Sequence, residues 1–146
     1  MKKHMMLWSI ALLAGTVFGL FMKGIESFTG KEVYVLLLNI DYFPIIKNIS
    51  FNEFQEFLLH LLVSLAVVYC LYYGMQRYQI RRIVWTCVWL NVLIAIFLYG
   101  TTAFSSRTPE ITDAWAFMYW LLGHVIYGLL VGFGIRQYRK SSGEES

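Results

Sequence analysis

Four long apolar segments limit what this chain can fold into. They cover residues 5–22, 54–73, 83–103 and 114–135. A helix of roughly 20 mostly apolar residues crosses the ~30 Å hydrocarbon layer of a bilayer, and its backbone groups are hydrogen-bonded within the helix. The sequence therefore predicts an all-α, polytopic membrane protein with four transmembrane helices. We expect residues 1–140 to form one membrane domain and residues 141–146 to form a disordered tail.

The composition supports the bilayer as the main partner. Of the 146 residues, 58% are hydrophobic and 14% are charged, whereas soluble domains average roughly 25% charged residues. The net charge of +3 does not indicate nucleic-acid binding, because the basic residues form short groups between apolar segments. Cys70 and Cys87 lack the paired spacing of a metal site. The first apolar segment continues past Ala14 and Gly15 without a small-residue cleavage motif, which predicts an uncleaved span.

Basic residues are divided unequally between the two sides of the predicted spans. One side holds Lys2, Lys3, Arg77, Arg81, Arg82, Arg136, Arg139 and Lys140. The opposite side holds Lys23, Lys31, Lys47 and Arg107, together with most of the acidic residues. Lysine and arginine are concentrated in the cytoplasmic loops of membrane proteins. We therefore predict that both termini are cytoplasmic and that the first and third loops lie outside.

The first loop is too long and too apolar to be a simple turn. Residues 33–38 are all apolar or aromatic, yet they are too few to cross the bilayer. We expect an interfacial or re-entrant segment here, followed by a turn that contains Asp41 and Pro44. Ser50 and Glu53 have the spacing of a capping box, which predicts that the second helix begins just outside the membrane.

Polar residues within the spans are the candidate functional groups. Glu56, His60 and Ser64 recur every four residues and therefore share one helix face. Ionisable side chains in spans usually face the protein interior. At about 1.5 Å per residue, His124 and Asn91 reach depths similar to that of His60. The sequence thus predicts one inward-facing polar cluster of these five residues.

Small residues and one charged pair complete the set of candidate positions. The predicted helix-packing residues recur at four-residue spacing and are Gly15, Gly19, Gly128 and Gly132. Such spacing is typical of helices that approach closely, within a chain or between copies. Lys23 and Glu26 are three residues apart at the outer interface, so they are expected either to pair or to remain separately solvated.

The polar cluster has four interpretations. Its members can form interhelical hydrogen bonds that only fix the packing. Histidine titrates near neutrality, so His60 and His124, with Glu56 as charge partner, can instead form a protonatable site. The same three residues are chemically suited to zinc or iron, although their spacing differs from that of di-iron bundles. Nucleophilic catalysis by Ser64 is the weakest interpretation, because the sequence shows no nucleophile elbow.

Three motifs occur in order along the chain. They are GTVFGLFMKGIE at residues 15–26, HLLVSLAVVYC at 60–70, and LLGHVIYG at 121–128 before a basic end. Together they resemble the YagU-type bacterial inner-membrane proteins. The resemblance implies a small multispanning protein of the bacterial inner membrane, loosely linked to acid resistance and without an established enzymatic activity. By motif it carries over Gly15, Gly19, Lys23, Glu26, His60, Ser64, Gly123 and His124.

These observations lead to one main hypothesis and two alternatives. The main hypothesis is a non-enzymatic integral membrane protein whose buried His/Glu cluster responds to external acid. The first alternative is a small transporter or channel subunit that oligomerises through Gly15 and Gly19. The second is a structural partner in a larger membrane complex. No cofactor or metal is expected, and the sequence does not specify a substrate.

Overall fold

The computed structural model describes residues 2–39, 51–105 and 107–143, and this part of the chain is helical without a strand. Its elements are α1 (Lys2–Thr29), α2 (Val33–Leu38), α3 (Glu53–Arg77), α4 (Ile83–Gly100), the short 3₁₀ helix η1 (Thr101–Phe104) and α5 (Ala114–Ser141). Four stretches within them are long and apolar enough to cross a membrane: Lys3–Thr29, Glu53–Arg77, Ile83–Phe104 and Ala114–Ser141. The predicted all-α polytopic fold is confirmed.

The helices extend beyond the apolar segments from which they were predicted. α1 continues to Thr29 and α5 to Ser141, so the last helix includes basic residues that the sequence places after its span. The start of α3 also differs from the prediction. Its N-cap is Asn52, whose side chain accepts the N–H of Gln55 at 2.9 Å while the Gln55 side chain accepts the N–H of Asn52 at 3.0 Å. The capping box thus lies two residues after the predicted one, because Glu53 is already the first helical residue.

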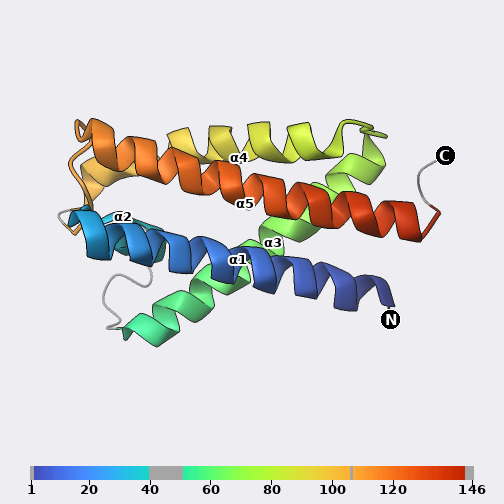
Figure 1. Ribbon diagram of the computed structural model, residues 1–146, viewed down its shortest axis with the longest axis horizontal. Coiled ribbons are helices and arrows are strands. Elements are labelled where there is room, and N and C mark those ends of the chain that lie inside the picture. Colours follow the sequence, from blue (N-terminus) through green and yellow to red (C-terminus); the bar gives the residue numbers. More distant parts are fainter. Residues whose placement is uncertain (1, 40–50, 106, 144–146) are drawn as a thin grey trace.

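The helices form an open bundle (Figure 1). α5 lies between α1 and α4 and packs extensively on both, whereas α3 crosses α1 diagonally. The described chain ends lie at the same end of the bundle as the connection from α3 to α4. The opposite end carries α2 and η1. This arrangement is the one expected for four successive spans. The predicted turn residues Asp41 and Pro44, and Ser50 of the predicted capping box, lie outside the described residues.

Glycines bring α5 against α4 at backbone distance. A Cβ atom on Gly128 would lie 2.9 Å from Cα of Val88, and one on Gly132 would lie 2.8 Å from Cα of Val84. Real Cβ atoms essentially never lie this close to another heavy atom. These two glycines, which the sequence predicted as packing positions, therefore set the separation of α4 and α5.

The glycines of α1 contact α3 of the same chain. A Cβ atom on Gly15 would meet the side chain of Ser64 at 2.9 Å, and one on Gly19 would overlap the ring of Phe57. The sequence left open whether Gly15 and Gly19 serve packing within the chain or contact between copies. In the structure, the space beside both residues is occupied by α3.

Lys23 and Glu26 do not pair with each other but bind separate partners. Lys23 Nζ lies 2.5 Å from the carboxylate of Glu53. The Glu26 carboxylate accepts the backbone N–H groups of Tyr34 (2.8 Å) and Val35 (3.0 Å) in the first turn of α2. A carboxylate at this position satisfies free N–H groups and complements the positive end of the helix dipole. The α2 helix, too short to be stable alone, is thus held against the end of α1.

The hydroxyl of Tyr34 joins α2 to α3. It donates a hydrogen bond to Glu53 at 3.1 Å. Burial of the phenol, together with the hydrogen bond to Glu53, raises the pKa of Tyr34 to about 12. Tyr34 therefore stays protonated at physiological pH and remains a donor to the carboxylate.

Lys31 and Asp113 join the start of α2 to the start of α5, with Lys31 Nζ 2.7 Å from the Asp113 carboxylate. The hydrogen bond from Lys31, with a backbone N–H from Ala116, holds the pKa of Asp113 below its ordinary value. A carboxyl with a lowered folded-state pKa contributes stability that is complete above its unfolded pKa of about 3.9 and is lost as the pH falls through the folded-state pKa.

We expect Asp113→Asn to cost less than about 1 kcal/mol at pH 7, because the pair is partly exposed. Asparagine is as good an N-cap as aspartate, so the bond to Ala116 is kept. The variant should also lose this residue's contribution to acid sensitivity below roughly pH 4. Unfolding in detergent, measured with and without Lys31→Met, forms a double-mutant cycle. If Asp113→Asn lowered the free energy of unfolding equally with and without Lys31→Met, the loss would not come from the ion pair.

Candidate functional site

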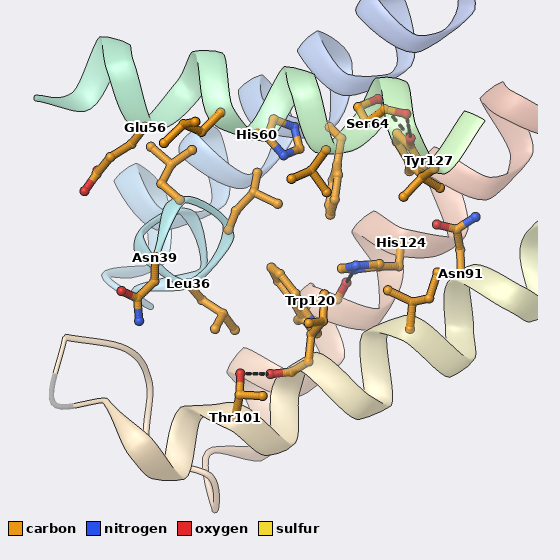
Figure 2. A pocket seen from close by; sticks show the side chains of 18 residues that line it. Leu36, Asn39, Glu56, His60, Ser64, Asn91, Thr101, Trp120, His124 and Tyr127 are labelled. Atoms are coloured by element: carbon orange, nitrogen blue, oxygen red, sulfur yellow. Dashed lines mark hydrogen bonds between the residues drawn. The ribbon is translucent and has the colours of Figure 1, made fainter. Parts of the chain in front are cut away.

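The five residues of the predicted polar cluster line one cavity (Figure 2). They are Glu56, His60, Ser64, Asn91 and His124. The cavity has a volume of about 230 Å³ and is otherwise lined mostly by apolar side chains. Every described element contributes to its wall: α1 through Phe18, η1 through Thr101, and the other helices through several residues each. Glu56, His60 and Ser64 lie along the cavity at i, i+4 spacing because α3 is a regular helix in this region.

Each imidazole is held by a backbone carbonyl rather than by the other imidazole. His60 Nε2 lies 3.0 Å from the carbonyl oxygen of Gly15, and His124 Nδ1 lies 3.1 Å from that of Trp120. A carbonyl oxygen only accepts, so the bonded ring nitrogen must carry the proton. In its neutral form, His60 is thereby assigned as the Nε2–H tautomer and His124 as the Nδ1–H tautomer. The lone pairs remain on His60 Nδ1 and His124 Nε2.

The ring of Phe18 contacts both histidines. Its centroid lies 5.8 Å from that of His60 and 4.8 Å from that of His124, with an edge-on geometry in both cases. The ring of Trp120 also contacts His124, and the centroids of these two rings are 4.4 Å apart. Phe18 was not predicted from the sequence. Its position three residues after Gly15, on the face of α1 that packs against α3, was the available signal.

Ser64 links three helices at one side of the cavity. Its hydroxyl donates to the carbonyl of Ala11 on α1 at 2.8 Å and lies 2.9 Å from the hydroxyl of Tyr127 on α5. Because Ser64 uses its only proton on Ala11, Tyr127 is the donor in the second bond. No hydrogen bond joins Ser64 to His60 in the described part of the chain, and this geometry gives no support to a serine nucleophile. Tyr127, three residues after His124, was missed.

Glu56 lies at the rim and is directed away from His60 (Figure 2). Its carboxylate lies 3.7 Å from the guanidinium of Arg107, so its charge partner is a residue of the loop before α5. Within residues 2–39, 51–105 and 107–143, no three His, Cys, Asp or Glu side chains are grouped so that they could hold a metal ion. The described geometry therefore supports neither the metal interpretation nor Glu56 as the direct partner of His60.

Asn91 is buried within α4, where its amide nitrogen donates to the carbonyl of Cys87 at 2.9 Å. Since the nitrogen must face this carbonyl, the amide oxygen faces the other way and lies on the cavity side (Figure 2). Asn91 thus contributes an acceptor to the cavity wall.

Comparison with known proteins adds no relative to this description. No protein-family model, curated protein or solved structure matches the chain. The four apolar helices nevertheless decide the general class. This is a multi-pass integral membrane protein.

Proposed function

We propose that this protein is a non-enzymatic membrane protein whose cavity responds to external acid through His60 and His124. One observation carries the proposal: two imidazoles line the same apolar cavity, contact the same phenylalanine ring, and each keep one ring nitrogen without a bond. Histidine is the side chain that changes charge within the range from neutral to mildly acidic pH.

Proton uptake in this cavity is coupled to hydration. A charge in apolar surroundings is stable only beside a counter-charge or water. The other titratable side chains that line the cavity are Glu56 and Tyr127; the residues that line it from α1, α2 and α4 carry none. Glu56 already faces Arg107, and two imidazolium ions around Phe18 repel each other. Protonation therefore favours an arrangement in which the cavity opens to water.

Orientation and family belong to the same proposal. We place both termini in the cytoplasm of a bacterial cell, because the end of the bundle that carries them also carries most of the basic residues. The order and spacing of the motifs at residues 15–26, 60–70 and 121–128 support membership in the YagU-type family, with its loose link to acid resistance. Under this topology the end of the bundle that carries α2 and η1, both of which line the cavity, faces the outside, so we infer that the cavity senses external pH.

The proposal predicts that His60→Gln and His124→Gln together abolish an acid-induced opening. The fluorescence of Trp120 can follow this opening, because its ring contacts His124. The other four tryptophans are largely exposed and can be replaced by phenylalanine, so that Trp120 is the only tryptophan that contributes to the signal. In nanodiscs, acidification from pH 7.5 to 4.5 should quench and red-shift Trp120 fluorescence as water and imidazolium approach it; those limits bracket roughly the range over which histidine titrates. The double variant should show no such change.

His4 provides the matched control. It is exposed near the N-terminus, where its ring bonds to Tyr69 far from the cavity. His4→Gln should leave the fluorescence response unchanged. An undiminished response in the double variant would refute the proposal and leave a packing role for the two buried histidines.

A further inference from the structure

α3 and α4 border an apolar groove on the surface of the bundle. They are consecutive helices, but α3 packs on α1 and α2 while α4 packs on α5. The groove between them is lined by side chains such as Ala66, Leu90, Leu93 and Phe97, together with the exposed thiol of Cys70. Leu90, Leu93 and Phe97 are exposed and therefore face lipid.

The groove and the histidine cavity adjoin each other. Four residues line both of them: Val63, Val67, Ile94 and Leu98. A lateral path from the lipid phase to the two imidazoles would run between α3 and α4, past these four side chains. The path is apolar along its length and becomes polar only at its inner end.

The polar end of this path offers mainly hydrogen-bond acceptors. The donors of Ser64, Tyr127, Thr101 and Trp120 are used within the protein. The bonded N–H of each imidazole is also used. Three acceptor atoms at this inner end are not used in these bonds: His60 Nδ1, His124 Nε2 and the amide oxygen of Asn91. The second N–H of the Asn91 amide is the one donor of these three side chains that is also not used.

These three acceptors have no hydrogen-bond partner among the described residues. In the described part of the chain, the side-chain polar atoms that are both fully buried and without a hydrogen-bond partner are Thr102 Oγ1 and Arg139 Nε. The three acceptors are not among them, so each retains some accessible surface. His124 and Asn91 are themselves almost completely buried, so the surface that their free atoms retain is cavity surface. Free acceptors in an apolar cavity are complementary to a ligand that donates.

We propose that the cavity and groove together bind a single-chain amphiphile with a small, uncharged, hydrogen-bond-donating head, such as a long-chain alcohol. The hydroxyl donates to an imidazole nitrogen or to the Asn91 amide oxygen, and the hydrocarbon chain lies in the groove between α3 and α4. The inference is independent of the acid response, because it uses the imidazoles in their neutral form.

Charge and depth both exclude an ordinary phospholipid head. Among the described residues no lysine or arginine lines the cavity, and Arg107 lies against the carboxylate of Glu56 at the rim. At 1.5 Å per residue, His124 lies about 15 Å along α5 from its start, near the middle of a ~30 Å hydrocarbon layer. Phospholipid heads stay at the interface, and only an uncharged head reaches this depth at low cost.

Dodecan-1-ol, its methyl ether and dodecylammonium test the head group. The three probes share one chain, and the ether lacks the donor. Binding to the full-length protein in nanodiscs is measured by native mass spectrometry. We expect the alcohol to bind roughly tenfold more tightly than the ether, because the ether leaves the acceptors unpaired. Asn91→Leu removes one acceptor but keeps both histidines, and it should reduce the difference in affinity between the alcohol and the ether.

Two tryptophan substitutions in α3 test the path. Ala66→Trp fills the groove and should weaken binding of the alcohol by roughly tenfold. Leu58→Trp introduces the same side chain at an exposed position that lines neither the groove nor the cavity, and should leave binding unchanged. Unfolding curves verify that both variants are folded.

Four results would overturn the inference. They are absence of alcohol binding, equal binding of the ether, tighter binding of the ammonium probe, and full binding by Ala66→Trp. All of these are measured at neutral pH, where the acid response is silent. If the wild-type protein showed no fluorescence response to acid, the proposed acid response would fail but this inference would stand. If the alcohol did not bind, this inference would fail but the proposed acid response would stand.

Discussion

Replacing Trp120 with alanine is expected to lower the free energy of unfolding by about 3 kcal/mol or more, the usual cost of removing a buried tryptophan side chain. Trp120 is 2% exposed and contacts Phe18 and His124. Its indole N–H donates to the carbonyl of Ala95 at 3.0 Å, which ties α5 to α4. In a bilayer the packing part of this cost persists, because lipid does not fill a void inside the bundle.

Trp115→Ala is the matched control for this prediction. Trp115 lies on the same helix but is 67% exposed, so its loss leaves no internal void. Chemical unfolding in detergent micelles, followed by circular dichroism, should separate the two variants clearly. Equal destabilisation would mean that the indole of Trp120 is not packed as described.

A single methyl group at Gly128 is expected to destabilise the protein by about 1–3 kcal/mol, the range of over-packed cores. The added Cβ would lie 2.9 Å from Cα of Val88 and 3.1 Å from the carbonyl oxygen of Cys87. Both are backbone atoms of α4, so relief requires the two helices to move apart. The loss occurs although alanine is the better helix former by about 1 kcal/mol.

Gly74→Ala gives the opposite expected result. Gly74 lies within α3, and a Cβ atom there would have no neighbour within 4 Å. The same substitution should therefore be neutral or stabilising by up to about 1 kcal/mol. Thermal unfolding of the two variants in the same detergent measures the difference. Comparable stability of both proteins would contradict the close approach of α4 and α5.

Periodicity and hydrophobicity predicted the parts of this protein that depend on regular helices. The four spans follow from the length of the apolar segments, and the inward positions of His60 and Ser64 follow from their spacing. These signals are local in sequence and are not altered by tertiary contacts.

Features that depend on the relative placement of helices were not predicted. Lys23 and Glu26 are close in sequence, but the chain folds back so that Glu53 and the first turn of α2 are better partners. The direction of Glu56 is set by Arg107 of the loop before α5. Phe18 and Tyr127 reach the cavity only because α1 and α5 both face α3. The groove arises from the divergence of α3 and α4, which no sequence pattern encodes.

The two cysteines differ in exposure, so that a label can be attached to one of them in the unmodified sequence. Cys87 is buried where α4 meets α5, while Cys70 is exposed in the groove. A thiol reagent dissolved in the lipid phase therefore meets one of the two sulfur atoms. A nitroxide attached there, without any substitution in the chain, would report on its own mobility and on the polarity of the medium between α3 and α4.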